Sequence, residues 1–180
     1  LRNSLIRKNL DKGKYRILGI DPGSRIAGYA LVDSCGNKMD LIDFGTVKLN
    51  HGFDGEKLYQ LSEFLIKVIE NSNPDMMAIE KVFMGKNALS ALKLGQARGV
   101  ILQTAQKLGV PQFDYSPNEI KKAVSGLGHA SKNQVQFMVK QLFCLKEIPE
   151  TDAADAIAVA VCHATNQAFK KLMSGVEKKK

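Results

Sequence analysis

The chain has 180 residues, of which 44% are hydrophobic and 24% charged, and this is the composition of an ordinary globular protein of about one domain. No apolar run approaches the ~20 residues of a membrane span, and the basic residues 1–15 lack the continuous apolar stretch of a secretory signal. The three cysteines form no C-x-x-C pair, which excludes a disulfide framework and the usual zinc ribbon. We therefore expect a protein of the reducing cytoplasm without a membrane span.

The formal net charge of +8 is concentrated at the two ends of the chain. Residues 1–16 hold six basic side chains and one acidic one, and residues 170–180 hold five lysines and one glutamate. Both segments lack apolar periodicity, so the sequence predicts one domain at 16–170 between basic, disordered tails at 1–15 and 171–180.

Within the domain, a basic block separates two acidic ones. Residues 81–140 carry nine basic and two acidic side chains, whereas residues 17–80 carry five and ten, and residues 141–169 carry one and four. This pattern is typical of a nucleic-acid-binding face, but an ordinary solvated surface produces it as well, and charge alone favours neither.

The predicted elements begin with three short apolar segments at 16–21, 26–33 and 41–48, which are joined by Gly-containing turns and predict antiparallel strands. Leucines at helical spacing from Leu58 then predict a helix that Pro74 ends. The remaining pattern alternates, with strands predicted at 76–82 and 110–115 and helices at 88–108, after Ser116, after Ser131 and at 151–169. A meander followed by alternating elements implies an α/β fold with a mixed five-stranded sheet and helices on both faces.

Two acidic residues stand at the ends of predicted strands. Asp21 follows an apolar strand and precedes Pro-Gly, where an aspartate by itself is most often a turn residue. Glu80 lies near the end of the strand predicted at 76–82, within the otherwise buried segment Met-Met-Ala-Ile-Glu-Lys-Val, where a carboxylate is costly unless it is paired or bound to a metal.

Two further acidic residues, Asp152 and Asp155, are three positions apart and share one face of the first turn of a predicted buried helix. Complementing the helix dipole would explain them without any function. If they converge with Asp21 and Glu80, however, the four carboxylates raise one another's pKa unless a divalent cation neutralises them. Oxygen-only ligands suit Mg²⁺ or Mn²⁺, and such clusters perform two-metal phosphoryl transfer.

Four motifs in these regions resemble the RuvC family: Ile-Leu-Gly-Ile-Asp-Pro-Gly-Ser-Arg (17–25), Ala-Ile-Glu-Lys-Val-Phe-Met-Gly-Lys-Asn-Ala (78–88), Ala-Leu-Lys-Leu-Gly-Gln-Ala-Arg-Gly (91–99) and Asp-Ala-Ala-Asp-Ala (152–156). RuvC proteins are bacterial Holliday junction resolvases with a ribonuclease H-like fold. The resemblance covers residues 16 to 170 in the expected order and departs only at the two ends of the chain.

The resemblance implies a structure-selective endonuclease that resolves four-way DNA junctions in recombination and repair, by paired metal-dependent cuts that leave 5′-phosphates. It implies two Mg²⁺ ions per subunit, with Mn²⁺ possible as a substitute. The family's four metal ligands correspond to Asp21, Glu80, Asp152 and Asp155. It further implies a homodimer and, as partners, the branch-migration proteins RuvA and RuvB.

The basic block contains the remaining candidate residues. By resemblance, Lys121 and Lys132 match family positions important for the cut, although for any single lysine a solvated surface charge is the simpler interpretation. Phe83 falls in a DNA-contacting loop of the family, whereas the sequence alone would assign Phe83 and Met84 to the core. The predicted DNA contacts are Phe83, Met84, Lys86, Lys93, Arg98 and Lys122.

Three questions stay open at the level of the sequence. Gly95 and Gly99 share one face of the helix at 88–108, where they allow close packing either on the protein's own sheet or on a second subunit. Asp-Pro-Gly-Ser also resembles the phosphate turn of actin-like and sugar-kinase phosphotransferases, which need two such domains. A non-catalytic junction-binding protein is the third possibility, but it requires the loss of at least one of the four acids.

Overall fold

The computed structural model describes residues 14–49, 54–82 and 87–177, with side chains described up to residue 168. The elements in chain order are β1 (Lys14–Asp21), β2 (Ile26–Cys35), β3 (Lys38–Lys48), α2 (Asp54–Ser72), β4 (Met76–Glu80), α3 (Ala88–Lys107), β5 (Gln112–Tyr115), α4 (Pro117–Ser125), α5 (Lys132–Leu142) and α6 (Thr151–Glu177).

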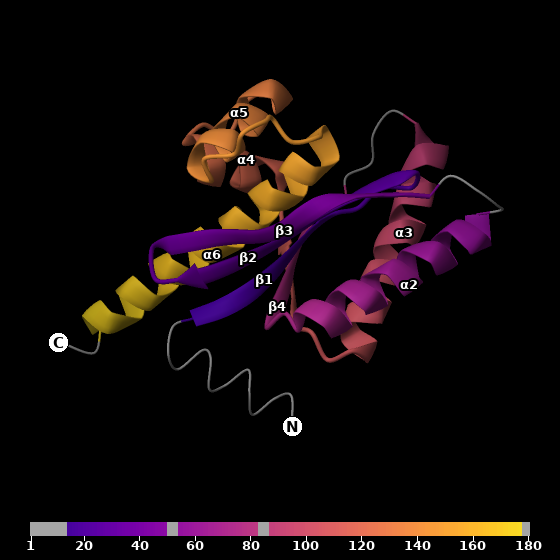
Figure 1. Ribbon diagram of the computed structural model, residues 1–180, viewed down its shortest axis with the longest axis horizontal. Helices are drawn as coiled ribbons and strands as arrows, with labels where there is room; N and C mark the ends of the chain where they lie inside the picture. Colours follow the sequence, from indigo (N-terminus) through magenta and orange to yellow (C-terminus); the bar gives the residue numbers. More distant parts are fainter. Residues whose placement is uncertain (1–13, 50–53, 83–86, 178–180) are drawn as a thin grey trace.

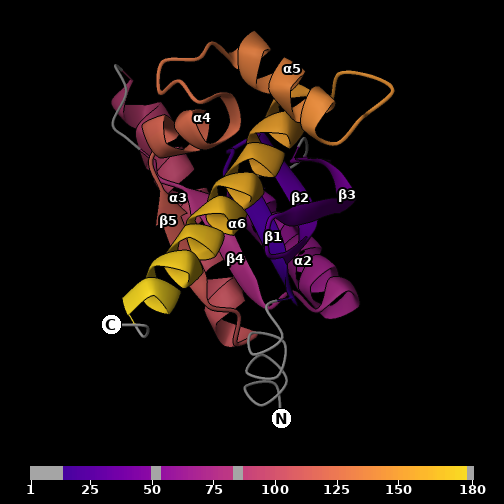
Figure 2. The ribbon, with the colours of Figure 1, turned by 90° about the vertical axis from the view of Figure 1, so that its left-hand side faces the viewer.

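The strands form one sheet in the order β3-β2-β1-β4-β5, in which the first three strands are antiparallel and β4 and β5 run parallel to β1. Helices α4, α5 and α6 cover one face, and α2 and α3 cover the other (Figures 1 and 2). The predicted mixed five-stranded sheet with helices on both faces is therefore confirmed.

The boundaries of several elements differ from those predicted from the sequence. Lys14 and Tyr15 extend β1 because they pair with Cys35 and Ser34 across the hairpin, and α6 continues to Glu177. Strand and helix thus reach into the segments that the sequence assigned to disordered tails.

The start of β5 also differs from the prediction, since the strand begins at Gln112 and not at Val110. The amide of Val110 donates to the carbonyl of Ala105 at 2.9 Å and so belongs to the end of α3. Pro111 has no amide hydrogen to contribute to a ladder.

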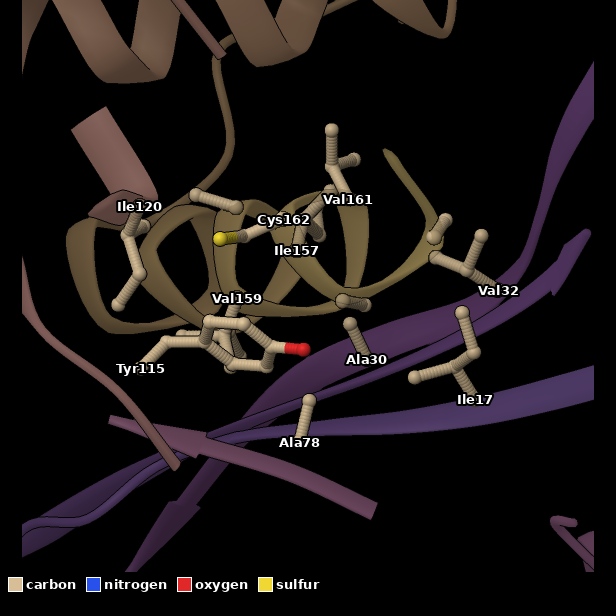
Figure 3. Packing of buried hydrophobic residues seen from close by; sticks show 14 of the residues in the cluster. Ile17, Ala30, Val32, Ala78, Tyr115, Ile120, Ile157, Val159, Val161 and Cys162 are labelled. Carbon is tan, nitrogen blue, oxygen red and sulfur yellow. The ribbon is translucent and has the colours of Figure 1, made fainter. Parts of the chain in front are cut away.

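Side chains alternate between two hydrophobic cores along each central strand. Ile17 packs in the core beneath α6, which Figure 3 shows, whereas Leu18 packs in the core beneath α2 and α3. In β4, Ala78 faces α6 and Ile79 faces the opposite core. Because the period of a strand is two, the last residues of β1 and β4 face the α6 side.

Helix α6 packs on the sheet at very close range. A Cβ added at Gly19 or Gly28 would lie well inside van der Waals contact with the main-chain oxygens of Ala156 or Asp152, respectively. From Ala156 to Ala164 every residue of the helix is buried, since the sheet covers one side and α4 and α5 cover the other. In the described ranges, no helix is long and apolar enough to cross a membrane.

A buried polar contact fixes the end of β5 to α6. The Oη atom of Tyr115 lies 2.8 Å from Nδ1 of His163, a fully buried side chain whose Nε2 lies 2.7 Å from Sδ of Met76. Tyr115 pairs with Glu80 in the sheet, so this contact also holds the segment next to Glu80 in place.

The close approach of α6 predicts that Gly28→Ala destabilises the protein by about 2 kcal/mol or more, because the added methyl group forces the helix away from the sheet. The control is Gly55→Ala in α2, where an added Cβ meets no atom within 4 Å and the higher helix propensity of alanine stabilises by up to about 1 kcal/mol. Urea unfolding measures both variants, and equal stability of the two would contradict this view of the packing.

Candidate active site

The sheet brings Asp21 and Glu80 next to each other. Each is the last residue of its strand, and the two strands are parallel neighbours with Ile20 opposite Ile79. Both carboxylates follow residues that alternate between the two cores, and both face the α6 side. The register of two buried strands thus places this pair of acids.

Helix α6 adds the other two acids to the same place. Asp21 pairs with Gly28 in the sheet, and the main chain of Asp152 lies directly over Gly28. Asp155 follows one helical turn later on the same face of α6, so its carboxylate also points toward the ends of β1 and β4. Residues far apart in the sequence therefore meet at one end of the sheet.

The pKa values show how strongly these acids interact. Burial, followed by the neighbouring charges of Glu80, Asp155 and Asp152, raises the pKa of Asp21 to about 8, while Lys132 opposes the shift. Burial, followed by the charge of Asp155, raises the pKa of Glu80. Burial also raises the pKa of Asp155, against the effect of Lys132. The cluster thus resists carrying its full negative charge in the absence of a cation.

Lys132 supplies a cation to this cluster, with its Nζ atom 3.4 Å from Oδ2 of Asp155. The lysine is the first residue of α5, where Ser131 and Gln134 form a capping box that fixes the start of the helix. Burial lowers the pKa of Lys132, but the adjacent Asp155 and the other acids raise it above its ordinary value.

An open cleft joins these groups. Five of the predicted residues line it together with the apolar side chains of Pro117, Ile120 and Val135: they are Asp21, Glu80, Asp155, Lys121 and Lys132. Lys121 comes from α4, whose start is fixed by a second capping box, formed by Ser116 and Glu119. Asp152 does not line the cleft, although it lies in the same turn of α6 as Asp155.

The donor chemistry of the cleft suits a hard divalent cation, because several carboxylate oxygens lie close together and burial and mutual repulsion raise their pKa values. Within the residues that the structure describes, no three His, Cys, Asp or Glu side chains are already arranged to hold a metal ion. The ammonium group of Lys132 instead provides the nearest countercharge for Asp155.

The predicted DNA contacts on α3 lie elsewhere and are engaged within the protein. Nζ of Lys93 is 3.2 Å from a carboxylate oxygen of Asp54 in α2. Nη2 of Arg98 is 2.7 Å from Oδ1 of Asp114 in β5, and Nε of this arginine is buried without a partner among the described residues. The structure does not bring these two cations into the cleft.

Of the other predicted contacts, the structure describes one. Lys122 is exposed on α4, next to Lys121. Phe83, Met84 and Lys86 lie outside the described residues.

One exposed cation beside the cleft was not predicted. Lys81 directly follows Glu80, and its amide donates to the carbonyl of Tyr115 at 2.8 Å. The charge of Lys81 also helps to lower the pKa of Glu119, after the hydrogen bonds from Ser116. The sequence contained a signal for this residue, because Lys81 directly follows the candidate acid Glu80.

Comparisons with known proteins agree with this fold. The family model described as crossover junction endodeoxyribonuclease RuvC matches residues 17–163. The RuvC proteins of Geobacter metallireducens and Geobacter sulfurreducens are each 46% identical to the chain over 162 residues, which is 89% of this chain and 99% of the relative.

Solved structures extend the comparison. The structure titled T. thermophilus RuvC in complex with Holliday junction substrate has a TM-score of 0.81 and 32% identity, and the match covers 87% of this chain and 96% of that one. The yeast mitochondrial Holliday junction resolvase Ydc2 shares the fold, with a TM-score of 0.69 and 20% identity. The predicted ribonuclease H-like fold is thereby confirmed, and the chain belongs to the RuvC family of crossover junction endodeoxyribonucleases.

Proposed function

We propose that this protein resolves four-way DNA junctions by metal-dependent hydrolysis of phosphodiester bonds, in recombination and repair. The observation that carries the proposal is the convergence of Asp21, Glu80 and Asp155 with Lys132 in one open cleft. Membership of the RuvC family, which includes a relative solved with a Holliday junction, supports the same activity. We further propose that one nuclease domain, at 16–170, performs it.

The four acids Asp21, Glu80, Asp152 and Asp155 are the proposed ligands of Mg²⁺, with two ions per subunit and Mn²⁺ as a substitute. When bound, the metal neutralises the carboxylates and stabilises charge that develops on the phosphate oxygens. The cationic residues of the cleft orient the scissile phosphate. Water attacks phosphorus, the bond to the 3′ oxygen breaks, and the products are a 3′-hydroxyl and a 5′-phosphate.

Lys121 and Lys132 are the proposed cationic residues of the reaction. Both line the cleft with the acids, and each stands on a helix whose start is fixed by a capping box. The ammonium group of Lys132 lies close to the carboxylate of Asp155 in the cleft. It is therefore placed to leave this carboxylate and bind a phosphate oxygen of the DNA instead. The other proposed contacts to DNA are Phe83, Met84, Lys86, Lys93, Arg98 and Lys122.

A homodimer is the proposed functional unit, because one cleft cuts one strand and a resolved junction needs two cuts. Helix α3 is the proposed interface. Its exposed face includes Leu89 and Leu92, which are 62% and 61% exposed. Added Cβ atoms at Gly95 and Gly99 would meet nothing within 4 Å, so these glycines do not serve packing within the chain. They leave room for a second backbone.

The other proposed partners are the branch-migration proteins RuvA and RuvB, and the proposed location is the cytoplasm. The phosphotransferase alternative is not supported by the relatives. They are crossover junction endodeoxyribonucleases, and the chain matches them over nearly their whole length. A non-catalytic junction-binding protein would lack at least one of the four acids, and all four are present.

The metal-site proposal predicts that Asp155→Asn lowers the rate of junction cutting at least ~100-fold, since even outer-shell partners of a metal are worth 10–100-fold. Binding of a synthetic mobile four-way junction stays near the wild-type level, because phosphate contacts dominate affinity. Gel assays with and without Mg²⁺ measure cutting, and a linear duplex serves as the control substrate. Equal cutting of junction and duplex would identify a general nuclease instead.

The raised pKa of Asp21 predicts a pH dependence of stability in the metal-free protein. Because the folded-state pKa is about 8 and the ordinary value 3.8, the stabilising contribution of the neutral form is complete below about pH 4 and is lost as the pH rises toward 8. Asp21→Asn lacks this titration, so its Tm in EDTA exceeds that of the wild type increasingly toward pH 8. Thermal melts across this range measure the difference, and a pH-independent difference would contradict the prediction.

The dimer proposal predicts that Gly95→Lys combined with Gly99→Lys produces monomers. Both changes raise helix propensity, by up to about 1 kcal/mol each, so the isolated subunit stays folded while the two side chains block the approach of a second helix. Analytical ultracentrifugation measures the mass, and circular dichroism controls for folding. A variant that remains dimeric would place the interface on another surface.

A further inference from the structure

Two exposed cations from the acidic block at 17–80 lie at the end of the sheet that carries the carboxylates. Strands β1, β3 and β4 all end at this end of the sheet, and β2 begins there. Lys48 is the last residue of β3, and Arg25 directly precedes β2. The carbonyl of Arg25 accepts a hydrogen bond of 2.7 Å from the amide of Leu49, so the two segments are tied together.

The register gives the distance from these cations to the candidate site. Asp21 pairs with Gly28, and Gly28 pairs with Thr46, so the three residues form a row across the sheet. Two strand spacings of ~4.8 Å and two residues of ~3.3 Å each put the Cα atoms of Asp21 and Lys48 about 12 Å apart. A side chain at this distance can reach a phosphate within a few nucleotides of the scissile one.

The cations lie on the side of the cleft away from Lys121. Helix α4, which carries Lys121, follows β5 at one edge of the sheet, whereas Lys48 ends β3 at the opposite edge (Figure 2). A DNA strand that passes over Asp21 would therefore meet positive charge from α4 on one side and from β2 and β3 on the other.

Neither Arg25 nor Lys48 forms an ion pair within the described part of the chain. Both residues are exposed. Of two carboxylates near this end of the sheet, Asp54 is paired with Lys93, and Glu150 accepts a hydrogen bond of 3.0 Å from the hydroxyl of Thr46. Lys57 of α2 lines a recess with Ser24 and Leu49, the chain neighbours of the two cations, on the side of the sheet that α2 and α3 cover.

We propose that Arg25 and Lys48 form a second phosphate-binding edge of the active cleft, which holds one arm of the DNA on the β3 side of the carboxylates. This inference rests on the proposed junction-cleaving function. It adds residues of an acidic segment to the predicted DNA contacts, all of which lie at 81–140.

The test compares two lysines at opposite ends of one strand. Lys38 begins β3 and Lys48 ends it, both are exposed, and ten residues of ~3.3 Å separate them by roughly 33 Å. We expect Lys48→Ala and Arg25→Ala each to weaken binding of a labelled synthetic four-way junction several-fold and to lower the salt slope of log K by about 1, while Lys38→Ala leaves both unchanged. Lys48→Arg keeps the charge and restores the wild-type slope.

The outcomes separate this inference from the function on which it rests. Fluorescence anisotropy over a range of salt concentrations gives the slopes, and thermal melts show that each variant is folded. If wild-type protein cuts the junction with Mg²⁺ but Lys48→Ala and Lys38→Ala have the same slope, the second edge is wrong and the proposed function stands. If wild-type protein does not cut junctions at all, the proposed function fails, whatever the slopes are.

Discussion

The close packing of α6 on the sheet is the contact on which the rest of the molecule depends. Gly19 and Gly28 remove the side chains that would separate helix and strands, and the alanine-rich, fully buried stretch of α6 fits against them. This contact brings the first turn of α6 over the end of β1, so that Asp152 and Asp155 meet Asp21. It also supports α4 and α5, which pack against the outer side of α6 and carry Lys121 and Lys132.

The arrangement places acids where burial and mutual repulsion oppose their ionisation, which is a cost to the folded state and an advantage for a site that has to attract a cation. The pKa of Asp21 shows this conflict most clearly, because several neighbouring charges act on one buried group. Lys132 relieves part of the repulsion without filling the oxygen-rich space. Stability and function therefore pull in opposite directions in the cleft, as is common where charged groups are concentrated for catalysis.

Topology also sorts the positive charge, and it does so differently from the order of the sequence. Lys93 and Arg98 belong to the basic block but are paired with Asp54 and Asp114 across the α3 packing surfaces. Arg25 and Lys48 belong to an acidic block, yet the antiparallel strands place them at the end of the sheet where the carboxylates lie. The charge of a segment describes its composition, whereas the face it presents depends on strand direction and register.

Sequence patterns alone determined the order of the elements, the mixed sheet and the burial of α6, because hydrophobic period and capping residues are local signals. They also singled out the four acids, since Glu80 in an apolar strand and two aspartates at the start of a buried helix are unusual. Boundaries such as the start of β5 depended on tertiary hydrogen bonds, which the pattern does not contain. Only the folded structure decided that Gly95 and Gly99 face outward, that Lys132 reaches Asp155, and that Lys48 lies at the same end of the sheet as Asp21. Each of these depends on which distant residues the sheet and α6 bring together.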